Sequence, residues 1–350
     1  METVQLIVDK EVDKENIYSQ AVDLLNQGEV VAFPTETVYG LGAVATNEEA
    51  VKKIFEAKGR PSDNPLIVHI GTIEEVSAYV EEISEKAKKL MERFWPGPLT
   101  LILKAKPGVL AKNVTAGLST VGIRMPDHEV ALGLLRTLKK PLAAPSANRS
   151  GKPSPTKAEH VYEDLQGRIP LILDGGTTGI GIESTVLDVT VNPPVILRPG
   201  GVTKEMLEAE IGEVIEPTPK EQQLESAPKA PGMKYTHYAP EAPVYLIEND
   251  CKKIEQAIEE LKKKGHKVAL LAPSHCAAAS ADYFFPFGEE EDQQQMAAKL
   301  YDSLRACDKT DATIILATTT STEGVGAAIM NRLYKAAGGK YINVRNLYNQ

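Results

Sequence analysis

Two kinds of apolar pattern alternate along the first two thirds of the chain. Residues 15–27 carry apolar side chains at helical spacing and are followed by Gly28, which predicts a helix that ends at this glycine. Asn47 and Ser84 stand where they would cap two further amphipathic helices. Short, nearly continuous apolar runs predict strands between the helices, at 30–33, 66–70, 99–104, 121–124, 171–173, 184–189 and 195–198.

The last part of the chain, after Pro243, follows a more regular pattern. Predicted strands at 244–247, 268–271 and 314–317 are each followed by residues with helical spacing, and the last helix is expected at 323–337. Strands that alternate with helices in this way are typical of a small parallel α/β domain.

A proline-rich segment separates these two parts. Residues 216–243 contain six prolines and show no helical period, so we interpret them as an extended and partly stiff linker. The linker includes the run PGMKYTHYAP at 231–240, which is too aromatic for a passive spacer. At 350 residues the chain is also long for a single core. We therefore predict two domains, 1–215 and 244–350, joined by this linker.

Charge and composition narrow the possible functions. The formal net charge of −9 argues against broad nucleic-acid binding, which depends on a basic surface, although it leaves room for a local anion site. The first residues, METVQL, lack the basic and apolar regions of a signal peptide. No apolar run approaches the roughly 18 residues that would span a bilayer. We therefore expect a soluble, cytoplasmic protein without a membrane partner.

The three cysteines, Cys251, Cys276 and Cys307, all lie in the last third of the chain. Their spacing matches no metal-ligand motif, so we predict no metal bound by the protein's own side chains. Because their number is odd, we expect no disulfide framework and a reducing compartment.

Candidate chemistry is concentrated between Phe33 and His69. Lys58 and Arg60 supply positive charge in a turn that prolines stiffen, and neutral hydrogen-bonding groups come from Thr35, Thr37, Ser62 and Asn64. Two strand ends and two polar turns joined by one helix indicate a pocket for a polyanionic ligand and a small polar co-substrate. Two alternatives stay open: the cations form a solvated pair at a helix end, and His69 is a satisfied core histidine.

Arg124 and Arg198 each stand at the end of a predicted strand, where a guanidinium needs a partner such as a carboxylate or phosphate. The glycine-rich loop 175–181 is either a lid over a site or a long turn. Ser146 and Ser184 have no histidine and aspartate arranged near them in sequence, which disfavours a serine hydrolase. The chain also lacks the phosphate-loop and dinucleotide-binding glycine motifs.

Several motifs occur in order and together resemble the YrdC/Sua5 family. They are FPTETVYGL at 33–41, KGRPSDNP at 58–65, WPGPLT at 95–100, RMP at 124–126, APSAN at 144–148, EST at 183–185 and LRPG at 197–200. The run at 231–240 and EGVGAAIMNRL at 323–333 resemble the two-domain Sua5 branch of the family. The resemblance covers essentially the whole chain. It implies an N-terminal twisted open α/β sheet with a concave, positively charged cavity and a smaller, Rossmann-like parallel α/β domain.

The resemblance also implies an activity. Members of this family are L-threonylcarbamoyladenylate synthases, which condense L-threonine, bicarbonate and ATP into threonylcarbamoyl-AMP and pyrophosphate. The product is the donor for the t6A modification of tRNA by downstream transferase proteins. Such a reaction requires positioning and charge neutralisation rather than a protein nucleophile, and Mg²⁺ would be held mainly by the ATP phosphates.

The family's site residues carry over onto matching positions of this chain. Lys58 and Arg60 would act in catalysis on the phosphates. The implied threonine pocket consists of Thr37, His69, Arg124, Ala144 and Ser184. The implied ATP site consists of Lys58, Arg60, Asn64, Thr120, Ser146, Ser154, Arg198, Tyr235 and His237, the last two from the linker.

Two rival functions remain at this point. One is an RNA-binding module, which the net charge of −9 disfavours, so we expect no stable nucleic-acid binding. The other is a carbamoyl-transfer maturation factor of the kind that also contains YrdC-like domains. Those proteins carry zinc-finger segments, and this chain has no Cys-x-x-Cys motif.

Overall fold

A computed structural model describes residues 1–9, 13–217, 238–277, 280–289 and 291–342. The chain forms two compact units. The described residues of the first unit are 1–9, 13–150 and 154–217, and those of the second are Gly151–Pro153, 238–277, 280–289 and 291–342. The short segment Gly151–Pro153 thus belongs with the C-terminal part, which nothing in the sequence pattern indicates. None of the helices in the described ranges is long and apolar enough to cross a membrane.

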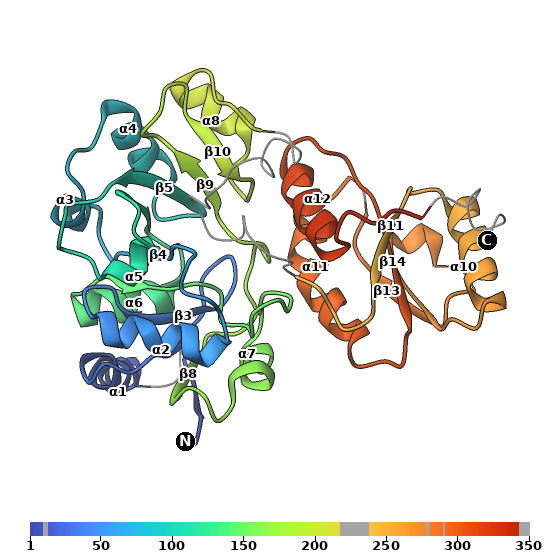
Figure 1. Ribbon diagram of the computed structural model, residues 1–350, viewed down its shortest axis with the longest axis horizontal. Coiled ribbons are helices and arrows are strands. Elements are labelled where there is room, and N and C mark those ends of the chain that lie inside the picture. The colour runs from blue at the N-terminus through green and yellow to red at the C-terminus, as the bar shows by residue number, and fades with distance from the viewer. Residues whose placement is uncertain (10–12, 218–237, 278–279, 290, 343–350) are drawn as a thin grey trace. The chain divides into compact units, whose positions relative to one another are not determined.

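The first unit is built on one ten-stranded mixed sheet with the order β1-β8-β2-β3-β7-β4-β6-β5-β9-β10 (Figure 1). Its strands are β1 (Val4–Ile7), β2 (Val31–Phe33), β3 (Gly40–Val44), β4 (Ile67–His69), β5 (Leu99–Lys104), β6 (Thr120–Arg124), β7 (Leu142–Ala143), β8 (Leu171–Asp174), β9 (Thr185–Asp188) and β10 (Val195–Arg198). The sheet is open, because β1 and β10 are its two edges.

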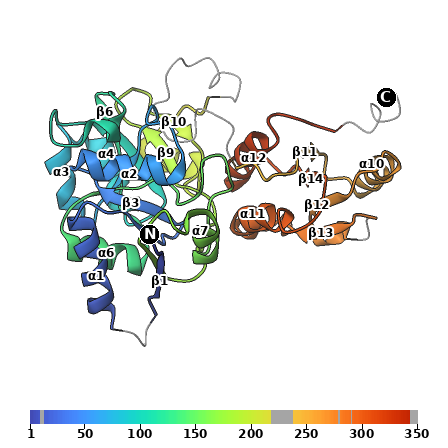
Figure 2. The ribbon, with the colours of Figure 1, turned by 60° about the horizontal axis from the view of Figure 1, so that its bottom comes forward.

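Helices cover both faces of this sheet. They are α1 (Lys14–Asn26), α2 (Glu48–Lys58), α3 (Val76–Tyr79), α4 (Glu85–Phe94), α5 (Lys112–Thr115), α6 (Glu129–Leu138), α7 (Ala158–Leu165) and α8 (Lys204–Ile211), with a 3-10 turn η1 at Ile73–Glu75. Figure 2 shows α1 and α6 on one side of β3, and α2 and α4 on the other. Two large hydrophobic clusters fill the layers, beside a smaller one of Ile67, Ile102, Val186 and Leu197. The residues of β2 alternate between the two large clusters, since Val31 and Phe33 join one and Ala32 the other.

Local signals account for several of these elements. Asn47 and Ser84 cap α2 and α4 by accepting the backbone N–H groups of Ala50 and Ala87, as the sequence predicts. By contrast, β3 carries no strand signal, because two of its five residues are glycines. Gly42 is required by packing, since a Cβ there would lie 2.8 Å from Cε1 of the Phe33 ring.

The second unit is a four-stranded, fully parallel sheet with the order β11-β14-β12-β13. Its elements are β11 (Val244–Ile247), α10 (Cys251–Lys263), β12 (Val268–Ala272), the 3-10 turn η2 (Ser274–Cys276), β13 (Tyr283–Pro286), α11 (Gln293–Cys307), β14 (Ile314–Thr318) and α12 (Val325–Ala336). Figures 1 and 2 show α11 and α12 on one side of this sheet and α10 on the other. The predicted parallel α/β domain is confirmed, with β13 as an additional edge strand.

A disulfide joins Cys251 and Cys276, whose Cα atoms are 5.3 Å apart. The expectation of no disulfide is therefore wrong for this pair, while Cys307 is free and buried. The odd cysteine count leaves one bridge possible. The bridge forms because Cys251 follows β11 and Cys276 follows β12, and parallel strands direct these following residues to the same edge of the sheet.

Candidate active site

Arg124 and His69 are the last residues of two neighbouring parallel strands, β6 and β4, and are register partners. Both side chains are buried. Arg124 donates from Nη1 to Thr37 Oγ1 at 3.0 Å and from Nε to the Gly97 carbonyl at 3.3 Å. The structure therefore brings together three residues of the predicted threonine pocket, although 87 positions separate Thr37 from Arg124.

Glu36 completes this cluster and was missed by sequence reasoning. Its Oε1 lies 2.6 Å from Arg124 Nη2, and the Glu36 side chain is only 12% exposed. The one available signal was an acidic residue inside the hydroxyl-rich FPTETVYG turn. The guanidinium thus already holds a carboxylate, which shows that its surroundings accept one.

The imidazole of His69 is neutral at ordinary pH. Burial, and after it the nearby Arg124 charge, lower the pKa of His69 to about 3. Its Nδ1 lies 3.3 Å from the Ile67 carbonyl. The burial of His69 and its contact with the Ile67 carbonyl fit the alternative of a satisfied core histidine. Because His69 also lies beside Arg124, its ring is part of the candidate site as well.

Ser184 and Arg198 form a second buried pair. Arg198 donates from Nε to the Ser184 carbonyl at 3.1 Å and from Nη2 to Ser184 Oγ at 3.2 Å. Ser184 Oγ also lies 2.8 Å from Thr100 Oγ1. Backbone contacts join this pair to the first cluster: the Thr185 N–H donates to the Pro98 carbonyl, next to the Gly97 carbonyl that Arg124 contacts. Ser184, a member of the predicted threonine pocket, therefore lies near the Arg124 cluster.

Lys58 lies in the last turn of α2 and is only 2% exposed. Its Nζ donates to the carbonyls of Ser146 at 2.5 Å and Asn148 at 2.7 Å, and Ser146 Oγ donates to Asn148 Oδ1 at 2.6 Å. A solvated surface charge is thus excluded for Lys58. The lysine instead fixes a positive charge against the turn that contains Ser146.

Arg60 and Asn64 occupy the turn that follows α2. Arg60 is partly exposed, donates from Nη2 to the Asn64 and Pro65 carbonyls at 3.2 and 3.4 Å, and lies 5.9 Å above the Phe55 ring. Asn64 is buried, and within the described residues neither atom of its side-chain amide has a hydrogen-bond partner. A buried amide without partners is unusual and is typical of a group that meets a ligand.

A pocket of about 530 Å³ opens beside this turn, with Phe55, Gly59, Arg60, Pro61 and Ser62 among its lining residues. Of the residues assigned to the implied threonine and ATP sites, Arg60 alone lines it, beside Ser62, which the sequence pattern also places in a pocket. The concave cavity implied by the resemblance thus stays a prediction.

Four of the predicted residues lie towards opposite ends of the β4–β6 pair, although Arg198 of the implied ATP site contacts Ser184 of the implied threonine pocket. Ile67 is the register partner of Gly122, and His69 that of Arg124. Asn64 precedes β4 and the partly exposed Thr120 begins β6, so both lie at the other end of the pair. At about 3.3 Å per residue the two groups are roughly 10–15 Å apart along the strands.

The remaining predicted residues surround the start of β3. The Tyr39 N–H donates to the Pro155 carbonyl and the Tyr39 carbonyl accepts from the Ala147 N–H, so Ser146 and Ser154 flank the same residue. Ser154 Oγ donates to Glu183 Oε1 at 2.5 Å. Ala144 directly follows β7, and its N–H is already bonded to the Ile67 carbonyl. Tyr235 and His237 lie outside the described residues.

The glycine-rich loop 175–181 is hydrogen-bonded to the turn that carries Thr37 of the predicted threonine pocket. The Ile180 and Gly181 N–H groups donate to the carbonyls of Glu36 at 2.8 Å and Thr37 at 3.1 Å, and the Thr178 N–H donates to Thr156. The sequence leaves open whether this loop is a lid over a site or a long turn, and the structure shows it held in place by these backbone hydrogen bonds. It positions the turn that carries Glu36 and Thr37.

Comparison with known proteins places this site in a family. Residues 23–200 match the Sua5/YciO/YrdC family, described as "Telomere recombination", and residues 202–338 match the family described as "Threonylcarbamoyl-AMP synthase, C-terminal domain". The chain belongs to the Sua5/YciO/YrdC family.

Relatives resemble the chain over almost all of its length. A Bacillus subtilis protein named threonylcarbamoyl-AMP synthase is 56% identical over 93% of this chain and 94% of its own. A Pyrococcus abyssi protein of the same name is 50% identical over 93% of this chain and 95% of its own. A crystal structure of P. abyssi Sua5 complexed with L-threonine superposes with a TM-score of 0.91 at 47% identity, covering 97% of this chain and 99% of that one.

Proposed function

We propose that this protein synthesises threonylcarbamoyl-AMP from L-threonine, bicarbonate and ATP. The observation that carries the proposal is the buried Arg124, which ends β6 beside a neutral His69 and holds a carboxylate next to Thr37. Such an arrangement suits an amino acid's carboxylate and polar groups, which supports the proposal. The names of relatives that are 42–56% identical, and the L-threonine bound in the P. abyssi structure, support the same activity.

The reaction needs two bond-forming steps. Bicarbonate first yields CO₂ and hydroxide, and the threonine amine adds to the CO₂ and becomes a carbamate, while the proton that it loses forms water with the hydroxide. A carbamate oxygen then attacks the α-phosphorus of ATP, the bond from phosphorus to the bridging oxygen breaks, and pyrophosphate leaves. Both steps depend on orientation and on stabilising negative charge, so no protein nucleophile is needed.

Within this proposal each cluster has a role. Arg124 binds the threonine carboxylate in place of Glu36, while Thr37, Ser184 and the Ala144 backbone hold the rest of threonine. Lys58, fixed by its two carbonyl partners, and Arg60 neutralise charge on the phosphates. The residues that contact ATP in the proposal are Asn64, Thr120, Ser146, Ser154, Arg198, Tyr235 and His237, and the unpartnered Asn64 amide supports this set.

Mg²⁺ is proposed to reach the site with ATP. Carboxylates near the site are already engaged, Glu36 with Arg124 and Glu183 with Ser154. Within the described ranges, the grouping of three potential metal-ligating side chains lies in the C-terminal unit. These observations fit an ion held mainly by phosphate oxygens and water, where it supplies charge neutralisation.

The product is a reactive mixed anhydride, so an enzyme that uses it is expected to act soon after its synthesis. We propose that it passes to the transferase proteins that make t6A on tRNA, without stable binding of RNA by this chain. Because tRNA is the final acceptor, we propose a cytoplasmic location.

The direct test is mass spectrometry of the product formed from ATP, L-threonine and ¹³C-bicarbonate. The expected product contains threonine, one ¹³C atom and AMP, and it appears together with pyrophosphate. An Arg124→Met variant serves as a control for adventitious ATP hydrolysis. Formation of ADP alone, or of AMP without a threonine adduct, would contradict the proposed function.

A further inference from the structure

The carboxyl edge of the small parallel sheet gathers four side chains that the proposed function does not use. Cys251 begins α10 after β11, His275 and Cys276 lie in η2 after β12, and Glu289 follows β13. Because β11, β12 and β13 run parallel, the residues that follow them reach the same edge. This edge is where open α/β sheets most often bind ligands.

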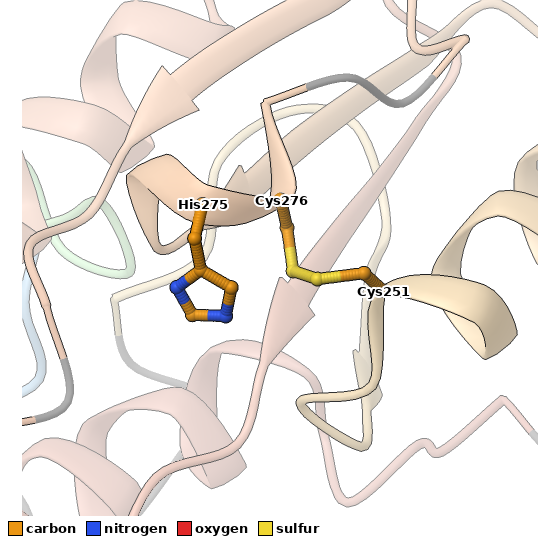
Figure 3. A group of neighbouring side chains, drawn as sticks. All are labelled: Cys251, His275 and Cys276. Atoms are coloured by element: carbon orange, nitrogen blue, oxygen red, sulfur yellow. A yellow bond between two sulfur atoms is a disulfide. The ribbon is translucent and has the colours of Figure 1, made fainter.

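Three of these side chains form a compact donor set. The ligand atoms of Cys251, His275 and Cys276 all lie within 4.8 Å of one another (Figure 3). Cys276 is buried, whereas His275 is exposed and accessible to an incoming ion. Two sulfurs and one imidazole nitrogen favour a borderline-soft ion, Zn²⁺ above all, over Mg²⁺ or Ca²⁺.

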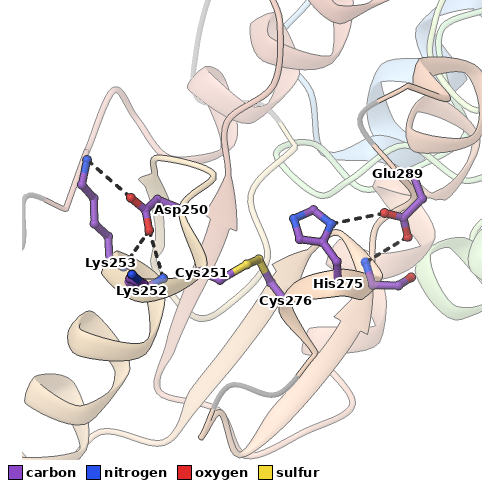
Figure 4. The surroundings of a disulfide bond; sticks show 8 residues. Asp250, Cys251, Lys252, Lys253, His275, Cys276 and Glu289 are labelled. Atoms are coloured by element: carbon purple, nitrogen blue, oxygen red, sulfur yellow. Dashed lines mark hydrogen bonds and ion pairs between the residues drawn. A yellow bond between two sulfur atoms is a disulfide. The ribbon is translucent and has the colours of Figure 1, made fainter.

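Glu289 orients the histidine. Its Oε2 lies 3.4 Å from His275 Nδ1, and its Oε1 accepts the Ser274 N–H at 3.2 Å (Figure 4). A carboxylate that accepts the Nδ1 proton leaves Nε2 as the nitrogen with a free lone pair. Carboxylate–histidine–metal arrangements of this kind fix the tautomer of metal-binding histidines in proteins.

The start of α10 fixes the position of Cys251. The helix has 13 residues, and Asp250 caps it by accepting the Lys252 and Lys253 N–H groups. Cys251 is the first residue after the cap, so the capped helix holds its backbone in place at the edge of the sheet.

We propose that Cys251, Cys276 and His275 bind one Zn²⁺ when the Cys251–Cys276 bond is reduced, with water in the fourth position. The disulfide accepts two electrons and two protons from a cellular dithiol, which becomes a disulfide itself. Zn²⁺ then displaces the two thiol protons and binds two thiolates and His275 Nε2. A reducing compartment, such as the proposed cytoplasm, would favour the reduced form. The site is independent of threonylcarbamoyl-AMP synthesis.

The test uses the full-length protein, reduced with a water-soluble phosphine that becomes the phosphine oxide as water supplies the oxygen. After removal of the reductant without air, Zn²⁺ alone is titrated in competition with a chromophoric chelator. We expect one Zn²⁺ per chain, and Co²⁺ in its place should give thiolate-to-metal absorption. Oxidised protein, lighter by two hydrogens in intact mass spectrometry, should lose this binding.

Matched variants separate ligands from the orienting residue. Cys251→Ser, Cys276→Ser and His275→Ala should each weaken Zn²⁺ binding by at least about 100-fold, and Glu289→Gln by roughly 10- to 100-fold at unchanged stoichiometry. Cys307→Ser, at a buried free cysteine outside the donor set, is the control and should bind Zn²⁺ as the wild type does. Circular dichroism confirms that each variant is folded. The proposal is overturned if reduced wild type binds Zn²⁺ no more tightly than the Cys251→Ser/Cys276→Ser double variant, or if His275→Ala leaves the affinity unchanged.

Discussion

Arg124 and Glu36 form a buried ion pair that offers a two-sided test of the threonine site. Arg124 Nη2 lies 2.6 Å from Glu36 Oε1, and the two side chains are 5% and 12% exposed. If threonine's carboxylate takes the place of Glu36, the guanidinium is required for binding while the glutamate competes with it. Arg124→Met and Glu36→Gln should then change the KM for threonine in opposite directions.

The size of each effect follows from the contacts. Arg124→Met leaves the Glu36 carboxylate buried without its partner, which costs on the order of 3–5 kcal/mol of unfolding free energy. Loss of a buried charge-assisted contact to substrate costs about 2–5 kcal/mol, or roughly 30- to 5,000-fold in kcat/KM for threonine. We expect a loss at the lower end of this range, because wild-type Arg124 exchanges the Glu36 carboxylate for that of threonine and so gains little net charge pairing. Glu36→Gln removes the competitor and should lower the KM for threonine by up to about tenfold, which is about 1.4 kcal/mol.

The double variant Arg124→Met/Glu36→Gln separates stability from binding. It removes both charges, so urea unfolding should show most of the lost stability restored. Its activity should stay as low as that of Arg124→Met, because the carboxylate clamp is still missing. The assay is pyrophosphate release that depends on both threonine and bicarbonate, together with ATP binding by calorimetry, which should stay within about threefold of wild type.

Two results would refute this reasoning. If the double variant recovered threonine-dependent kcat/KM along with its stability, Arg124 would be a structural residue only. If Glu36→Gln raised the KM for threonine as much as Arg124→Met does, Glu36 would be part of the substrate site rather than a competitor for it.

Three further predictions concern the rest of the site. Lys58→Met should reduce pyrophosphate release at saturating substrates. It should also lower the unfolding free energy in urea by about 1–3 kcal/mol, because the Ser146 and Asn148 carbonyls lose their donor. Threonine-dependent turnover within twofold of wild type would contradict this prediction. Asn64→Leu should leave the unfolding free energy equal or higher, because the amide that it removes has no hydrogen-bond partner in the described residues. The same variant should weaken ATP binding, measured by calorimetry, by about tenfold. Unchanged ATP affinity would count against a role of Asn64 in binding ATP. For His69, whose pKa falls from 6.5 to about 3 in the folded protein, the unfolded chain takes up the proton first as pH falls. Stability should therefore be full above about pH 6.5 and decline towards pH 3 by at most about 1.4 kcal/mol per pH unit. Urea unfolding of His69→Gln should show a shallower decline, and equal slopes would argue against the shift.

The sequence by itself determined the elements that depend on neighbouring residues. Capping at Asn47 and Ser84 and the apolar period of α1 are local properties, so the pattern alone predicts these helices. The same holds for the alternation that identifies the parallel C-terminal domain. Candidate site residues such as Lys58 and Arg124 could be named because charged groups beside apolar strands need partners wherever the chain folds.

The partners themselves were decided only by the tertiary structure. The sheet order places β1 beside β8 and β4 beside both β7 and β6, and nothing local encodes such an order. It is this order that brings Glu36 to Arg124, turns Lys58 onto the Ser146 carbonyl, and leaves the Asn64 amide buried without a partner. In the C-terminal unit, parallel pairing likewise carries Cys251 and Cys276 to one edge and overrides the inference from an odd number of cysteines. Each of these contacts joins residues far apart in sequence, so the free energy that fixes them comes from packing of the whole sheet and not from the local pattern.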